Sequence, residues 1–276
     1  MSTRVPVGEP GVRRHLVSGL SLALGGANVI MQLSRPAVGR GVIESTVASG
    51  SLHRHPVKRT RTTLGYIMIA LYGTDEERLV MRREVDRQHR SVHSSEESPV
   101  SYNAFDPQLQ LWVAACMFCG LVDAAHYLYG ALDDATLDEL YQRSAFFATT
   151  LQVPESMWPR DRAAFEEYWT AALEEVGVDD ATRRFLLGLA SLDFLPRALR
   201  WPLAPVHRFL TTGFLEQRFR DELGLEWNES QKRRFEVVRS VARRANALAP
   251  RLVREFPWNL VLWDTRRRIT AGRSVV

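Results

Sequence analysis

The chain shows a helical periodicity along most of its 276 residues, and this limits its fold more than any other feature. Apolar residues recur three and four positions apart in segments that end at glycine or proline. At Gly73-Thr74-Asp75, for example, one helix stops and the next receives its N-cap. No run of alternating β-branched residues is present, and no hairpin dipeptide is flanked by one. The pattern predicts an all-α protein with a single globular multi-helix domain.

The breaks between the periodic segments give the approximate helix boundaries. Asp106-Pro107 begins the helix that contains Trp112, because proline is accepted in a first helical turn. Pro6, Gly8 and Pro10 predict a flexible N-terminal tail over residues 1–12, which leaves 13–276 as the helical domain. Candidate helices cover about residues 14–34, 36–48, 56–72, 75–93, 106–130, 133–150, 159–176, 179–193, 205–222, 229–247 and 248–254.

Charge and cysteine content limit the partners and the compartment. Although the pI is near 9.3, only Lys58 and Lys232 are lysines, and the arginines alternate with acidic residues, as over 76–87. Such mixing is typical of solvated helix faces rather than a phosphate-binding stripe, so we expect no nucleic-acid partner. Cys116 and Cys119 lack the second pair that a tetrahedral zinc site needs. They are interpreted as buried thiols, and a cytoplasmic location is expected.

The segment from Leu16 to Leu33 has no charged residue and follows Arg13 and Arg14. It is at the lower length limit for a membrane span and contains three glycines. We interpret it as a buried or surface-docked helix, and membrane association is not favoured.

His89 is the first candidate for chemistry. It lies four residues after Val85 and three before Val92, so it shares an inward helix face with them and with Leu79 and Met81. An imidazole on an apolar face is either hydrogen-bonded or bound to a metal, and the sequence leaves both open. A haem would need one inward histidine and enough apolar volume between helices.

Arg59 and Thr63 are four residues apart, hence on one helix face. A buried arginine needs an anion, which a haem propionate or a substrate carboxylate could supply. The alternatives are an ion pair with an acidic residue such as Glu44 or a solvated charge.

Several groups of residues follow one another in a fixed order. They are Pro36-Ala37-Val38 with Gly41-Val42, Arg59-Thr60-Arg61-Thr62-Thr63, His89-Arg90-Ser91-Val92, Tyr102-x-Ala104-x-Asp106-Pro107, Trp112-Val113, Leu195-Pro196 with Leu199-Arg200, Gly224-Leu225-x-Trp227 and Pro250-x-Leu252-x-Arg254. Together they resemble the catalytic domain of the rubber oxygenases, the family of the latex-clearing proteins and the MpaB-type oxygenases.

The resemblance implies an O2-using enzyme with haem b, whose proximal iron ligand is His89. Arg59 and Thr63 are implied to line the haem pocket, and Glu44 is a candidate base. Family members act on lipophilic, often isoprenoid, carbon chains, so a hydrophobic small molecule is the expected substrate. The chain departs from the latex-clearing branch at Thr62, where a lysine can occur, and at Ala114, where a histidine is frequent.

Two alternatives remain. Asp86-x-x-His89 and Asp123-x-x-His126 resemble half of a di-iron ligand set, with Glu44 and Glu167 as the further carboxylates. A helical protein that binds haem or a lipophilic ligand without turnover is the other. Among the other histidines, His93 shares the helix face of His89, which makes a two-histidine site geometrically allowed, and His53 and His55 are expected in a solvated loop.

Overall fold

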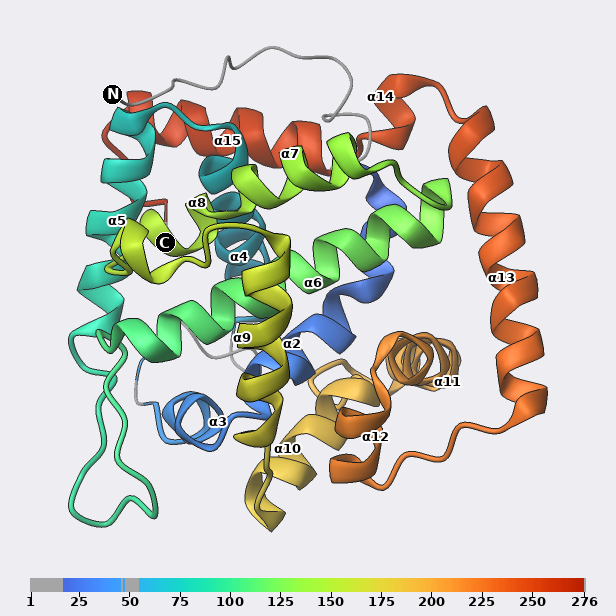
Figure 1. The fold of residues 1–276 in the computed structure, drawn as a ribbon, viewed down its shortest axis with the longest axis horizontal. Coiled ribbons are helices and arrows are strands. Elements are labelled where there is room, and N and C mark those ends of the chain that lie inside the picture. The colour runs from blue at the N-terminus through green and yellow to red at the C-terminus, as the bar shows by residue number, and fades with distance from the viewer. Residues whose placement is uncertain (1–16, 46, 48–54, 276) are drawn as a thin grey trace.

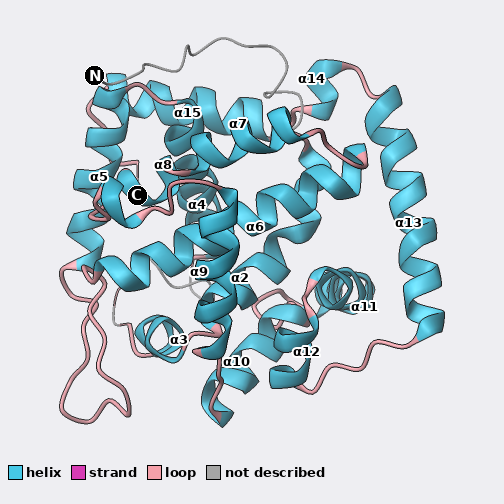
Figure 2. Ribbon diagram, in the orientation of Figure 1, coloured by secondary structure: helices cyan, strands magenta, loops and turns pink. Residues whose placement is uncertain are grey.

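The computed structural model describes residues 17–45, 47 and 55–275, which fold into helices joined mostly by short connections (Figure 1). Figure 2 shows no strand, and within the described residues extended pairing is limited to one antiparallel bridge between His93 and Asn103. The predicted all-α class is confirmed. The predicted tail over 1–12 lies outside the described residues, as does His53.

The helices are η1 Gly19–Leu24, α2 Gly25–Leu33, α3 Pro36–Ile43, α4 Pro56–Tyr72, α5 Asp75–His89, α6 Pro107–Tyr129, α7 Asp134–Ser144, α8 Phe146–Thr149, η3 Glu155–Met157, α9 Arg162–Glu174, α10 Asp180–Ala190, α11 Arg197–Phe214, α12 Gln217–Leu223, α13 Glu229–Leu248, α14 Arg251–Arg254 and α15 Trp258–Thr270.

Helix α6 crosses the middle of the molecule, with other helices packed around it (Figure 1). Asp106 caps its first turn by accepting a hydrogen bond from the Gln108 backbone N–H at 2.8 Å. Both core clusters draw on this helix, one through Phe118 and the other through Trp112, which is fully buried. Among the described helices α6 alone is long and apolar enough to cross a membrane, but most of that stretch is buried inside the protein.

The uncharged segment that begins the described chain is part of this core. In α2, Ile30 and Met31 are buried against α6 and α10. The Asn28 amide donates to the backbone carbonyl of Cys116, an approach that Gly120 permits because a Cβ there would lie 2.3 Å from the Asn28 nitrogen. The prediction of a buried helix in this segment is therefore confirmed for α2.

Helices α4, α5 and α15 form a connected unit on the other side of α6. Thr74 and Glu77 make a capping box that starts α5 directly after α4. Helix α15 packs along α4, and Arg266 pairs with Glu77 at 3.0 Å and donates to the Tyr72 carbonyl at 2.8 Å. The C-terminal helix therefore fixes the relative positions of α4 and α5.

Some predicted boundaries are wrong. Helix α5 ends at His89 and not at residue 93, because Val92 and Tyr102 pair the following segment with the chain before α6. Leu79, expected on the inward face of α5, is 48% exposed. The predicted helix 133–150 is divided at Ala145 into α7 and α8, and the predicted helix 36–48 ends at Ile43.

The largest errors concern the C-terminal third. Helix α11 begins at Arg197, although Pro202 and Pro205 lie inside it. Both prolines are exposed, so water can solvate the carbonyls that lack an N–H partner. The predicted helix 205–222 is two helices, α11 and α12, and the whole of α15 was not predicted.

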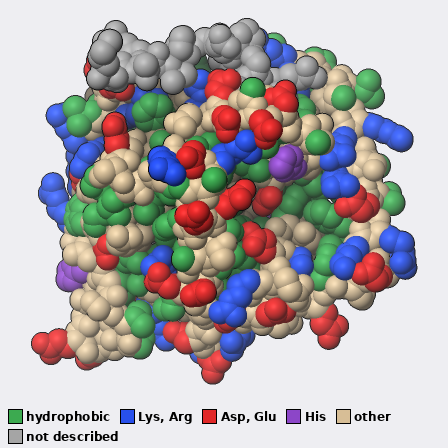
Figure 3. Space-filling model, viewed as in Figure 1, with side chains coloured by type: hydrophobic (Ala, Val, Ile, Leu, Met, Phe, Trp, Pro, Cys, Tyr) green, Lys and Arg blue, Asp and Glu red, His purple; other side chains and the backbone are tan. Residues whose placement is uncertain are grey.

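Figure 3 shows acidic and basic side chains intermixed on one face of the molecule, without a stripe of a single sign. Many of the arginines form short ion pairs within one helix, such as Arg87 with Glu84 at 2.8 Å. Such a distribution is typical of solvated helix faces.

Candidate functional site

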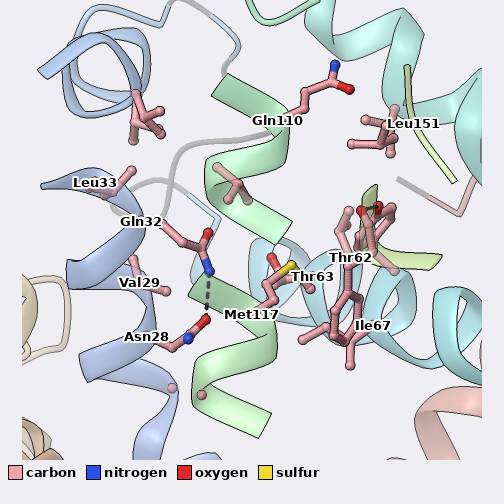
Figure 4. Close-up of a pocket in the computed structure, with 18 of the residues that line it drawn as sticks. Asn28, Val29, Gln32, Leu33, Thr62, Thr63, Ile67, Gln110, Met117 and Leu151 are labelled. Carbon is pink, nitrogen blue, oxygen red and sulfur yellow. Dashed lines mark hydrogen bonds between the residues drawn. The ribbon is translucent and has the colours of Figure 1, made fainter. Parts of the chain in front are cut away.

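A cavity of about 400 Å³ lies beside α6, and α2, α3, α4 and α5 supply most of its other walls. Figure 4 shows part of the lining, with Asn28 and Gln32 of α2 and Thr62, Thr63 and Ile67 of α4. Most lining side chains are aliphatic or aromatic. The volume falls in the range of about 300–1,000 Å³ that small-molecule sites occupy. The cavity is therefore the candidate functional site.

His89 lines this cavity as the last residue of α5. The side chain is half-buried, and neither ring nitrogen makes a hydrogen bond within the described residues; Nδ1 is fully buried. Phe105 packs edge-on against the ring, with centroids 6.2 Å apart. Burial lowers the pKa of His89, and the charge of Arg59 lowers it further. Both effects favour the neutral imidazole, which is the form that binds metal ions, and no described protein group partners it at the cavity wall.

Arg59 and Thr63 line the cavity together, as expected from their spacing on α4. No described acidic side chain lies within ion-pair distance of Arg59. Neighbouring atoms desolvate the guanidinium and lower its pKa, although the residue as a whole is exposed. The alternative of an ion pair with Glu44 is not observed, since Glu44 lies beside Arg40, and the cation of Arg59 remains available to an anion.

Thr62 and Thr63 use their hydroxyl hydrogens on their own helix. The Thr63 Oγ1 donates to the Arg59 carbonyl at 3.1 Å, and the Thr62 Oγ1 donates to the Lys58 carbonyl at 2.9 Å. Each hydroxyl oxygen keeps lone pairs and can still accept a hydrogen bond from a ligand. The two threonines therefore offer acceptors to the cavity.

Glu44 is not among the residues that line the cavity. Its Oε2 accepts hydrogen bonds from the Ser98 hydroxyl at 2.6 Å and the Tyr102 hydroxyl at 2.9 Å, and Arg40 lies 3.5 Å from Oε1. The Ser98 hydrogen bond is the main reason why the pKa of Glu44 is lowered. These contacts tie α3 to the chain before α6 and hold Tyr102, which does line the cavity. A base role for Glu44 stays a prediction.

The polar residues of the opposite wall were missed from the sequence. Gln32 donates to the Asn28 side chain at 2.7 Å (dashed in Figure 4), and the Gln32 carbonyl accepts from the Trp112 indole at 2.9 Å. Gln110 is buried, and it donates to the Ala104 carbonyl at 2.8 Å. Its Oε1 accepts from the Gln152 backbone N–H at 2.9 Å. The sequence feature that could have predicted this polar wall is the presence of amide side chains inside otherwise apolar helices.

The described residues contain no ligand set for the two-iron site considered as an alternative. Across the described part of the chain, no group of three or more His, Cys, Asp and Glu side chains is close enough to hold a metal ion. Asp86 instead accepts a hydrogen bond from the Gln152 amide. Asp123 has its pKa raised to about 7, mainly by burial and further by Glu216, and neither it nor His126 lines the cavity.

The remaining predicted residues lie away from the cavity or have no ligand role. His93 is exposed and belongs to the bridge with Asn103, so it does not share a face with His89. Cys116 and Cys119 are unpaired thiols, buried and half-buried, and burial raises the pKa of both. The interpretation as buried thiols is confirmed.

Comparison with known proteins gives one matching family and two close relatives. Residues 12–244 match the model of the ER-bound oxygenase mpaB/B′ and rubber oxygenase catalytic domain. The chain is 51% identical to the uncharacterized protein Mb2261 of Mycobacterium bovis over 255 residues, which are 92% of this chain and the whole of that protein. The same identity and coverage hold for the uncharacterized protein Rv2237 of Mycobacterium tuberculosis. No solved structure matches the chain.

Proposed function

Because this chain belongs to the ER-bound oxygenase mpaB/B′ and rubber oxygenase catalytic-domain family, we propose that it is an oxygenase that holds haem b through His89 and oxidises a lipophilic small molecule with O2. The family supports the oxygenase activity itself. Haem and the substrate class are the further content of the proposal, and the geometry of the cavity supports them.

The unpaired imidazole of His89 is the observation that carries the proposal. A buried polar atom without a partner costs free energy, and the Nδ1 of His89 is such an atom. A cofactor iron would give this unpaired imidazole the partner that the described residues do not supply. Arg59, a cation without a described acidic partner, would pair with a haem propionate or a substrate carboxylate. The residues present therefore fit a haem.

The protein's own groups would act by binding, orienting and excluding water. When bound, the haem would supply the redox chemistry that activates O2. The neutral state of His89 leaves its nitrogen free to bind at physiological pH, since burial and Arg59 both oppose its protonation. The amides of Asn28 and Gln32, which hydrogen-bond to the Cys116 carbonyl and to each other, would form the fixed opposite wall of the pocket.

The lining of the cavity supports a lipophilic substrate. Aliphatic side chains such as Val113, Met117 and Leu151 surround the space between the polar groups. Each buried methylene of a ligand would contribute about 0.8 kcal/mol to binding. A small molecule with a C=C bond or an electron-rich carbon fits the oxygenase chemistry of the family.

One observation favours a second candidate, a haem or lipophilic-ligand binding protein without turnover. Thr62 stands where the latex-clearing branch can have a lysine, and Ala114 is buried and does not line the cavity. Glu44, the remaining candidate base, already accepts hydrogen bonds from Ser98 and Tyr102. O2 consumption in the presence of candidate lipids distinguishes the two functions.

The first experiment is an absorption spectrum of protein from haem-supplemented cells, for wild type, His89→Ala and His93→Ala. We expect a Soret band in the wild type that disappears in His89→Ala. His93→Ala is the matched control, because His93 is exposed and lies four residues away, and it should keep the band. A Soret band that His89→Ala leaves unchanged would contradict the assignment of the ligand.

A further inference from the structure

Helix α15 has apolar side chains on two opposite faces. Trp258, Leu262 and Thr265 are buried against the rest of the protein. On the other face Leu260 and Trp263, three residues apart, are 50% and 56% exposed, and Phe256, just before the helix, is 58% exposed. Packing within the chain explains the first face but not the second.

The exposed apolar surface continues onto the neighbouring elements. Helix α14 precedes α15 directly, and η1 lies against their junction: the Trp258 indole donates to the Ser18 carbonyl at 2.9 Å, and Gly19 touches the Phe256 carbonyl. We call this surface the C-terminal patch. It consists of Leu20, Leu22, Leu248, Leu252, Val253, Phe256, Leu260 and Trp263, which are 37% to 84% exposed. Contiguous apolar surface of this kind marks an interaction site.

The patch is accompanied by most of the chain's excess positive charge. Residues 244–270 contain six arginines and two acidic residues, a formal net charge of +4, which equals that of the whole chain. The two acidic residues, Glu255 and Asp264, pair with Arg251 and Arg268, each at 2.7 Å. The segment therefore has no acidic residue left to pair with its other four arginines.

One of these arginines is exposed beside the apolar residues of α15. Arg267 has no acidic partner within the described residues, whereas Arg254, also without one, is half-buried and has its Nε buried. The Arg267 guanidinium lies over the Trp263 ring, 5.4 Å from its centroid. Trp, Leu and Phe beside unpaired arginine are the composition of a surface that binds the interface of an anionic membrane.

The patch also borders the cavity described above. Leu22 belongs to both, and Trp258, at the start of α15, lines the cavity from the inward face of the same helix. A molecule dissolved in a membrane would therefore meet this side of the cavity wall first.

We propose that the C-terminal patch docks on an anionic lipid membrane, with Phe256, Leu260 and Trp263 in the acyl boundary and Arg267 at the phosphates. A second copy of the chain fits less well. A two-fold contact through this patch would place two segments of charge +4 against each other, and like charges oppose such an association. The inference does not depend on haem or on turnover.

Cosedimentation with vesicles tests the proposal. The vesicles contain equal parts phosphatidylglycerol and phosphatidylcholine, or phosphatidylcholine alone. We expect the wild type to bind the anionic vesicles more tightly than the neutral ones. The double variant Leu260→Ser/Trp263→Ser should bind the anionic vesicles at least roughly tenfold more weakly than the wild type does. The matched double variant Leu260→Phe/Trp263→Phe should keep the binding, because it keeps the apolar surface.

A second variant tests the charge independently of the apolar positions. Arg267→Glu should also weaken binding to anionic vesicles and reduce its salt dependence. Failure of the wild type to sediment with anionic vesicles would overturn the proposal, and so would equal binding by the serine variant. A dimer in light scattering without lipid, lost in the serine variant, would overturn it in favour of a contact between copies.

Discussion

On the α2–α6 side of the cavity the polar side chains hydrogen-bond to each other and to the backbone. On the α4–α5 side Tyr66 donates to the Phe147 carbonyl at 2.6 Å, whereas His89 and Arg59 have no partner within the described residues. Asn28, Gln32 and Gln110 belong to the first wall, and each makes at least one hydrogen bond of 2.7–2.9 Å. His89 and Arg59 belong to the second wall, and within the described residues neither side chain hydrogen-bonds to protein. Both walls are built from helices that line the same cavity, so they differ in how their polar groups are partnered and not in their place in the fold.

The difference indicates what each wall is for. A hydrogen-bonded amide inside an apolar helix positions the helices around it, because removal of one partner leaves another buried group unsatisfied. A buried atom without a partner, such as the Nδ1 of His89, lowers stability and persists where something outside the chain completes it, and the exposed cation of Arg59 is available to an anion. We therefore regard the α2–α6 wall as a scaffold and the α4–α5 wall as the ligand-binding side.

Gln110→Met is expected to show the largest effect on the scaffold wall. The substitution leaves the Gln152 backbone N–H and the Ala104 carbonyl without their partner, which should lower the free energy of unfolding by about 1–3 kcal/mol. Urea unfolding of the ligand-free protein measures this loss. Gln108→Met is the matched control, because Gln108 is an exposed glutamine of the same helix, and it should change little. Equal stability of the two variants would contradict a scaffold role.

His89 predicts a pH dependence on the ligand-binding wall. Its pKa is lowered in the folded protein, so below its ordinary value of 6.5 the unfolded chain binds a proton that the folded chain does not. Stability should therefore fall as the pH decreases below 6.5, by at most about 1.4 kcal/mol per pH unit. The contribution of His89 to this slope should be absent from His89→Leu.

The difference between wild type and His89→Leu must be measured rather than either curve alone. Asp123, whose pKa is raised to about 7, gives a slope of the opposite sign, since its folded form binds the extra proton. Urea unfolding above and below pH 6.5 gives the difference directly. Parallel curves for the two proteins would show that His89 is not held neutral by the fold.

The helical class and the positions of the α4–α5 residues could be predicted because they depend on local sequence. The i, i+4 spacing of Arg59 and Thr63 places both on the cavity, as does the position of His89 after Val85. The end of α5 could not be predicted, since it depends on pairing between His93 and Asn103, ten residues apart. For the same reason His93 could not be separated from His89.

The scaffold wall depends on contacts that span the chain, and its roles were not visible in the sequence. The partner of Gln110 is Gln152, and the partner of Asn28 is the carbonyl of Cys116. Helix α15 was missed because Pro257 and the arginines near its end resemble a loop and a tail, although Trp258, Leu262 and Thr265 fit one helix face. Its packing on α4 is a tertiary effect that overrides the local signal.

Arg59→Met is expected to give the smallest effect and the sharpest contrast between the walls. In the ligand-free protein the substitution removes a charge that burial disfavours and keeps much of the side-chain volume, so stability should stay constant or rise by less than about 1 kcal/mol. The gain is small because the guanidinium keeps accessible surface, where water screens its charge. Arg160→Met, at an 88% exposed position, is the control for loss of one arginine and should remain within about 0.5 kcal/mol of wild type. Arg59→Met should also weaken the retention of haem, measured as the Soret absorbance that remains after gel filtration, whereas Arg160→Met should not.

A ligand-free Arg59→Met protein that is destabilised as much as Gln110→Met would mean that Arg59 is part of the scaffold, and the distinction between the two walls would fail.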